Sequence, residues 1–154
     1  MFNDSAYEHT QHGWWHWLIY GNAAVLLVTL CILPAHPVIG TVFPIVVVSL
    51  MALAFMFREL TVRDASEALI VEFGPLHVFR KRVAYADIAK VSPARSRFID
   101  GWGIHYGLGE GWIWNISGYD CVRLELKNGR RLRIGTDEPE KLCAFLRTRI
   151  RSAN

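Results

Sequence analysis

The sequence has no lysine or arginine before Arg58. All 17 basic residues lie at or after Arg58, and the first 57 residues carry only Asp4 and Glu8 as charged side chains. The net charge is therefore −2 for residues 1–57 and +5 for residues 58–154. This division excludes a uniform globule. A hydrophobic content of 52% excludes a disordered chain, and only 3 cysteines without CxxC spacing exclude a disulfide scaffold.

Two stretches of 20 residues, 14–33 and 38–57, contain no Asp, Glu, Lys or Arg. Each would be about 30 Å long as an α-helix, which matches the hydrocarbon core of a bilayer. Helix is favoured in lipid because every backbone polar group must be paired within the segment. Pro34 and Pro37 separate the two stretches. The sequence thus predicts a transmembrane helical hairpin at 14–57, preceded by a polar segment at 1–13.

Basic residues indicate the orientation of this hairpin. The connecting turn has none, whereas Arg58 and Arg63 follow the second span. The positive-inside rule then predicts a multi-pass plasma-membrane protein with both termini in the cytoplasm. A cleavable signal peptide is the competing interpretation, but no basic region precedes the first span and no small-residue cleavage pattern follows it. In this compartment we expect Cys121 and Cys143 to be reduced and buried.

Residues 58–154 are expected to form a cytoplasmic domain of short strands closed by one helix. Alternation of apolar and polar residues predicts strands at 60–64, 69–73, 76–79 and 86–91, and a hairpin of 122–126 with 132–134 around Asn128-Gly129. A helix at about 138–151 follows, with Thr136 or Asp137 as its cap. Its apolar stripe consists of Leu142, Phe145, Leu146 and Ile150.

Glycine and tryptophan are concentrated in residues 101–118. A glycine-rich phosphate-binding loop is one interpretation, but no GxxxxGK[ST] motif is present. We therefore expect a β-hairpin formed by 103–106 and 112–116. This hairpin is a candidate surface for binding a partner, through Trp102, Trp112 and Trp114.

Four segments carry a likeness to a known family: ADIAKV at 86–91, GWGIH at 101–105, GWIWNISG at 111–118, and the stretch from Asn128-Gly129 to IGTDEPE at 134–140. Together with the hairpin, they resemble small bacterial membrane proteins with a pleckstrin-homology-like (PH-like) domain. The resemblance implies an inner-membrane protein and a small β-barrel or sandwich of about seven strands closed by the helix. It implies no single activity.

Arg80-Lys81-Arg82 is the densest basic run. It is a candidate site for anionic lipid headgroups, since each basic residue near the inner leaflet adds about 1 kcal/mol of attraction. The alternative is a solvated strand edge whose charges block edge-to-edge pairing. The loop at 65–67 is neutral to acidic, which argues against specific binding of inositol lipids.

Three histidines, His9, His12 and His16, are spaced i, i+3, i+7. On a continuous helix over 8–17 they would share a face and could bind a metal or haem. Gly13 weakens that helix, so we favour a solvated amphipathic lead-in and expect no metal and no cofactor.

The residue types favour a non-enzymatic protein that acts by binding other molecules. No Ser-His-Asp arrangement, carboxylate pair or HExxH motif is present. Nucleic acid is not an expected partner, because there is no recognition helix and the net charge of +5 is modest. We expect an accessory or assembly subunit that contacts lipids and either another integral membrane protein or further copies of itself. Binding of anionic headgroups is the alternative function.

Overall fold

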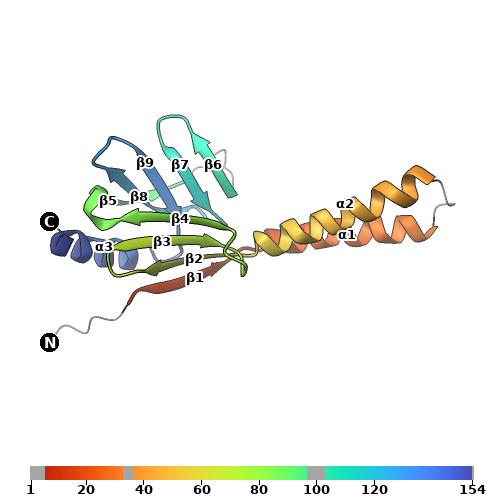
Figure 1. Ribbon diagram of the computed structural model, residues 1–154, viewed down its shortest axis with the longest axis horizontal. Helices are drawn as coiled ribbons and strands as arrows, with labels where there is room; N and C mark the ends of the chain where they lie inside the picture. The colour runs from red at the N-terminus through yellow and green to blue at the C-terminus, as the bar shows by residue number, and fades with distance from the viewer. Residues whose placement is uncertain (1–5, 33–36, 97–102, 154) are drawn as a thin grey trace.

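The computed structural model describes residues 6–32, 37–96 and 103–153. In chain order the elements are β1 (Glu8–His12), α1 (Trp15–Ile32), α2 (Pro37–Met56), β2 (Glu59–Asp64), β3 (Ala68–Phe73), β4 (Phe79–Ala84), the 3₁₀ turn η1 (Tyr85–Asp87), β5 (Ile88–Arg95), β6 (Gly103–Gly107), β7 (Gly111–Asn115), β8 (Asp120–Leu126), β9 (Arg131–Gly135) and α3 (Pro139–Ala153). The strands and α3 form one body, called here the β body. The α1–α2 hairpin projects from one end of the β body, and α3 lies at the other end (Figure 1).

The strands form two sheets. Sheet A has the order β1-β2-β3-β4, and sheet B has the order β5-β8-β9-β7-β6. Neighbouring strands are antiparallel except for β7 and β9, which are parallel. Within the part of the chain that the structure describes, neither sheet closes into a barrel. The expected mainly-β domain behind a helical hairpin is confirmed. The described residues form nine strands, of which β1 lies before the hairpin, compared with about seven expected in residues 58–154.

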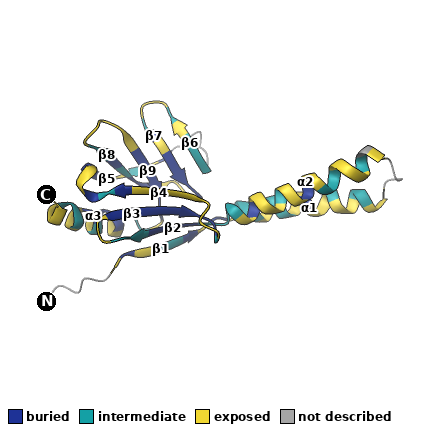
Figure 2. Ribbon diagram, viewed as in Figure 1, coloured by how far each residue is buried: buried dark blue, intermediate teal, exposed yellow. Residues whose placement is uncertain are grey.

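The core lies between the inner faces of the two sheets and under α3. Period-two alternation turns one set of side chains inward, and Leu60, Val71, Leu124 and Ile134 are all within 1% of complete burial. Burial of each such side chain contributes about 1.5–3 kcal/mol to folding. Dark blue strands in Figure 2 mark this core, in contrast to the mostly exposed hairpin.

The helical hairpin is an insertion between two paired strands. β1 precedes α1, β2 follows α2, and the two strands pair antiparallel with Glu8 opposite Arg63 and His12 opposite Glu59. The N–H of Gly13 donates a hydrogen bond to the carbonyl oxygen of Arg58 at 3.0 Å. Both ends of the hairpin are therefore fixed side by side at one end of sheet A.

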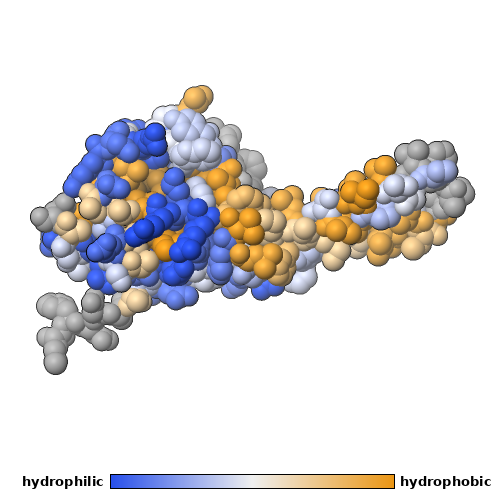
Figure 3. Space-filling model, in the orientation of Figure 1, coloured by the Kyte–Doolittle hydropathy of each residue, from blue (hydrophilic) through white to orange (hydrophobic). Residues whose placement is uncertain are grey.

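The two helices are long and apolar enough to cross a membrane. Only 6% of the 18 residues Trp15–Ile32 and 11% of the 18 residues Ile39–Met56 are buried. The helices touch through small or branched side chains, since Ala23, Val47 and Ala54 are the buried ones. Figure 3 shows apolar side chains along the hairpin and polar side chains across the visible face of the β body.

The β4 strand begins later than the sequence suggests. Residues 76–79 were expected to be a strand, but 74–78 form the turn between β3 and β4. Gly74 and His77 have φ values of 67° and 50°, which a strand cannot accommodate. Arg80, Lys81 and Arg82 consequently lie inside β4 rather than after it.

The late elements agree with the sequence. β8 and β9 form the predicted hairpin, with Gly129 at φ 80° in its turn, and β6 and β7 form the other one. Leu142 and Leu146 of α3 are completely buried in the core. At the start of α3, the Thr136 hydroxyl accepts a hydrogen bond from the N–H of Glu138 at 3.1 Å.

Candidate functional site

The base of the hairpin is rich in aromatic side chains. Trp14, just before α1, and Trp17, in its first turn, are 53% and 69% exposed. Phe57, directly after α2, packs against Phe73 and Phe79 with ring centroids 5.2 and 5.5 Å apart. These contacts couple the end of α2 to the adjacent ends of β3 and β4. Exposed indoles at the end of an apolar helix are typical of a membrane–water interface.

An apolar recess of about 410 Å³ lies where the hairpin meets the two sheets. It is lined by Trp15, Ile19, Leu53, Phe57, Phe73, Gly103, Ile104 and Ile116. Side chains from both helices and both sheets contribute to it, so the hairpin is packed against the β body and is not merely tethered to it.

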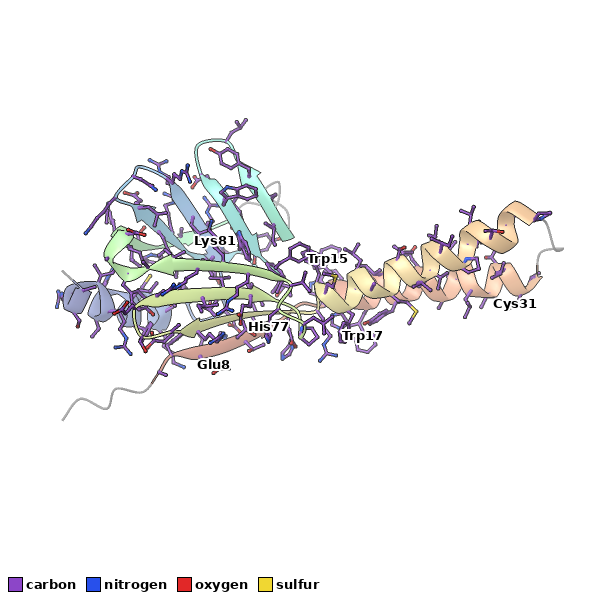
Figure 4. All side chains as sticks on the ribbon, in the orientation of Figure 1. Glu8, Trp15, Trp17, Cys31, His77 and Lys81 are labelled. Atoms are coloured by element: carbon purple, nitrogen blue, oxygen red, sulfur yellow. The ribbon has the colours of Figure 1, made fainter. Side chains whose placement is uncertain are left out.

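The basic run at 80–82 lies on β4, which is an edge strand of sheet A. Arg80 is opposite Glu72 and Arg82 is opposite Ile70, both on the outer face of the sheet. Lys81 is opposite Val71, which belongs to the core, so Lys81 lies on the side that faces sheet B (Figure 4). The three cations are therefore divided between two faces of one strand.

Arg80 forms an ion pair with Glu72. Glu72 lies on the outer face of sheet A, yet its side chain is only 2% exposed because three cationic or ionisable neighbours cover it. The nearest contacts to its carboxylate are Arg80 Nε at 3.0 Å, Arg63 Nε at 3.1 Å and His77 Nδ1 at 3.4 Å. The hydrogen bond from Arg63 to Glu72 raises the pKa of Arg63. This cluster leaves Lys81 and Arg82 as the available charges of the run.

Arg82 lies further from the hairpin than Arg80, because β4 runs away from the hairpin. It lines a recess of about 400 Å³ together with Tyr85 and Arg149. Arg149 is already paired with Asp64. A bilayer that holds the helices would therefore meet Arg80 before it meets Arg82.

The candidate tryptophans have different environments. Trp112 is 47% exposed, whereas Trp114 is only 7% exposed and its ring lies 5.7 Å from that of Phe73 in the core. Trp102 lies outside the described residues. Of Trp112 and Trp114, only Trp112 is accessible to a partner.

Trp112 belongs to a wider exposed group at the end of the β6–β7 hairpin. Its ring makes a T-shaped contact with Tyr106 at 5.8 Å, and Tyr106 is 64% exposed. Leu108, in the turn, is 97% exposed. A groove of about 380 Å³ runs from this aromatic pair to Arg130 and Arg131. We call these five side chains the tip surface.

The aromatic pair of the tip surface, Tyr106 and Trp112, lies on the inner face of sheet B. Trp112 is opposite Leu132 and Trp114 is opposite Ile134, and both partners are core residues. The inner face is therefore covered at Trp114 and open at Trp112. In Figure 1 the end of the β6–β7 hairpin extends beyond the β4 edge of sheet A. Arg131 supports the turn through a hydrogen bond from Nη1 to the carbonyl oxygen of Gly109 at 2.6 Å.

The amino-terminal histidines do not share a helical face, so the helix over 8–17 that the metal or haem interpretation needs is not formed. Residues 8–12 form β1, held by backbone bonds to β2, and α1 begins only at Trp15. His9 Nε2 lies 2.5 Å from Oδ1 of Asp137, whereas His12 Nδ1 lies 3.6 Å from Glu59, on the other face of β1. His16 lies in α1. Among residues 6–32, 37–96 and 103–153, no group of three or more His, Cys, Asp or Glu side chains is placed to hold a metal ion.

Cys121 and Cys143 are free and buried, as expected from the sequence. Burial raises the pKa of both thiols. Since the thiolate is the reactive form, both cysteines are chemically protected, whereas Cys31 on α1 is exposed.

Comparison with protein-family models and with curated proteins finds no match to this chain. The geometry of the hairpin base, the β4 edge and the tip surface is thus the basis for the proposals that follow.

Proposed function

We propose that the protein is a two-span integral membrane protein whose β body is a non-catalytic interaction module at the cytoplasmic face of a bacterial inner membrane. The helices support a membrane location because they are apolar and almost entirely exposed. Several polar side chains within the two helices are also satisfied internally. Asn22, Thr29 and Ser49 each donate to the carbonyl oxygen four residues earlier at 2.8 Å. Such internal pairing suits a segment surrounded by lipid.

The pairing of β1 with β2 supports the proposed orientation. A hairpin inserted between two paired strands must return to the side from which it left, so both ends of the chain share one side. Arg58 and Arg63 lie on that side, and the positive-inside rule makes it the cytoplasm. We also propose that the β body is PH-like. Two packed sheets followed by one helix against the core agree with that fold, although the strand count is higher than expected.

The tip surface supports the interaction role. Large apolar side chains beside arginines are the residue types that contribute most to protein interfaces. The partner in this proposal is another integral membrane protein or a second copy of the chain. Confinement of both partners to one membrane raises their effective concentration and allows a small surface to be sufficient.

Mild-detergent purification of the full-length chain from its native membrane tests this role. We expect Trp112→Ala to reduce the amount of co-purifying partner by about tenfold or more, as for an interface tryptophan. Arg147→Ala, on an exposed position of α3, is the matched control and should change nothing. Trp114→Ala is unsuitable, since it would damage the core. Unchanged recovery of the partner with Trp112→Ala would contradict the proposal.

Binding of anionic headgroups by the β body is the second candidate function. It is favoured by Lys81 and Arg82, for which the structure describes no ion pair. The test is hydrogen exchange of the full-length chain in nanodiscs. Replacement of phosphatidylcholine by phosphatidylglycerol should slow exchange in β4, and the double variant Lys81→Glu/Arg82→Glu should abolish this protection. Equal exchange in both lipids would exclude this function.

A further inference from the structure

We infer that the turn between β3 and β4 inserts its apolar side chains into the membrane interface and forms a third membrane contact beside the two helices. The turn comprises residues 74–78. Its ligand is the lipid surface itself, at the boundary between headgroups and acyl chains. The inference rests on the proposed membrane location of α1 and α2, and it adds a fixed orientation of the β body on the bilayer.

The turn exposes apolar side chains where a soluble domain would place polar ones. Leu76 is 64% exposed and Val78 is 60% exposed. Neither belongs to the hydrophobic core or packs against it. Hairpin turns usually carry small or polar residues, so two large apolar side chains exposed in one turn favour contact with an apolar environment.

The structure holds this turn against the end of the hairpin. The N–H of Gly74 donates to the carbonyl oxygen of Glu59 at 2.8 Å, and a Cβ at Gly74 would lie only 2.3 Å from the carbonyl oxygen of Met56, the last residue of α2. The two stems of the turn, Phe73 and Phe79, both pack on Phe57. The turn therefore cannot move away from the membrane while α2 crosses it.

The surroundings of the turn have the composition of an interface. Figure 4 shows His77 at the same end of the β body as Trp15 and Trp17 on the first turns of α1. Arg58 lies there as well, with its guanidinium carbon 5.9 Å from the ring centre of Phe55. An exposed indole such as that of Trp17, and an arginine whose stem lies along apolar side chains, are typical of the headgroup level. His77 folds back onto Glu72, so the polar residue of the turn points to the β body and leaves Leu76 and Val78 outermost.

Three forms of the full-length chain, each with one accessible thiol, test the inference in phosphatidylcholine nanodiscs. An environment-sensitive fluorophore is attached to native Cys31, to Leu76→Cys, or to Leu108→Cys, with Cys31→Ser in the last two. Cys121 and Cys143 are buried and should not react. Nitroxide-labelled lipids, with the nitroxide shallow or deep in the acyl chain, then report the depth of each label. Val78→Cys is a second probe of the same turn.

We expect Cys31 to be quenched by lipid nitroxides, the labels at 76 and 78 to be blue-shifted and quenched best by the shallow nitroxide, and the label at 108 to be unaffected. Leu108 is the matched control because it is an exposed leucine in a turn at the tip surface. If Cys31 is quenched while the labels at 76 and 78 behave like that at 108, the inference is wrong although the membrane location stands. If Cys31 itself is not quenched, the proposed membrane location fails and the inference fails with it.

Discussion

Arg149 of α3 forms an ion pair with Asp64 at the end of β2, and this pair joins the carboxyl-terminal helix to sheet A. The Asp64 side chain is only 2% exposed. The Tyr85 hydroxyl donates a second hydrogen bond to it, at 2.7 Å. Burial and this bond raise the pKa of Tyr85 well above its usual value. A buried carboxylate thus holds together the last helix, an early strand and the 3₁₀ turn.

Arg149→Ala should destabilise the β body, because it leaves the buried Asp64 carboxylate without its cation. Loss of one partner of a largely buried pair costs about 2–4 kcal/mol of unfolding free energy. Arg147→Ala, two residues earlier on an exposed face, should change it by less than about 0.5 kcal/mol. Thermal unfolding of the detergent-solubilised chain, followed by tryptophan fluorescence, measures both. Equal melting temperatures for the two variants would show that the pair has no structural role.

Gly111 should be more sensitive to alanine than Gly109, although both have positive φ values, of 76° and 78°. A Cβ at Gly111 would lie 2.1 Å from the carbonyl oxygen of Arg131, whereas a Cβ at Gly109 meets nothing within 4 Å. Gly109→Ala should therefore lower the unfolding free energy only by the conformational penalty of about 1–2 kcal/mol. Gly111→Ala should lower it by the same penalty and by about 1–3 kcal/mol more, because its Cβ clashes with β9.

The same two glycine variants also test the tip surface. Gly111→Ala separates β7 from β9 and should reduce partner recovery as Trp112→Ala does, while Gly109→Ala should leave recovery close to that of the native chain. Co-purification and thermal unfolding of both variants are the measurements. The packing described at Gly111 would be refuted by two variants of equal stability.

Alkaline pH should destabilise the β body through Tyr7. Burial, with the nearby carboxylate of Glu138, raises the pKa of Tyr7 to about 12, from an ordinary value of 10.0. The unfolded chain then loses its phenolic proton at lower pH than the folded chain. The stabilisation is complete below pH 10 and is lost as pH rises from about 10 to 12, by at most about 3 kcal/mol.

Tyr7→Phe isolates this contribution, since phenylalanine can keep the stacking on Phe145, where the ring centroids are 5.0 Å apart. Unfolding free energies of both chains between pH 9 and 12 are the measurement. We expect the native chain to lose more stability than Tyr7→Phe over this range, with Tyr85 contributing to the loss in both. If both chains lost the same unfolding free energy between pH 9 and 12, the alkaline destabilisation could not be assigned to Tyr7.

Elements with a local signal could be predicted from the sequence. The two apolar helices, the turn at Asn128-Gly129 and the stripe of α3 each follow from residues close together in the chain. The β1 strand could not be predicted in this way, because its partners in β2 lie beyond both helices. The parallel pairing of β7 with β9 is likewise a non-local contact without a sequence signature.

In the candidate site, the alternation of side chains along a strand predicts the face of a residue but not its exposure. Trp112 and Trp114 are two residues apart in one strand, so alternation places them on the same face. Their exposure differs because the Phe73 ring covers Trp114 but not Trp112. The positive φ of His77 could not be predicted from the sequence either, because a non-glycine residue rarely adopts that conformation. With His77 in the turn, β4 begins only at Phe79.

The orientation can be tested by reporter fusions. Since β1 pairs with β2, a fluorescent or enzymatic reporter at either end of the chain should be active only in the cytoplasm. A reporter inserted between α1 and α2 should give the opposite result. If one terminal fusion were active and the other inactive, the two termini would lie on opposite sides of the membrane, which would contradict the paired strands as well as the two spans.

Alkaline carbonate extraction of membranes that contain the full-length chain tests the central claim most directly. Carbonate removes proteins that are held only at the surface, whereas two membrane-spanning helices resist it. We predict that the chain stays in the membrane pellet and is released only by detergent, even if the high pH unfolds the β body. Recovery of the chain in the carbonate supernatant would contradict the account.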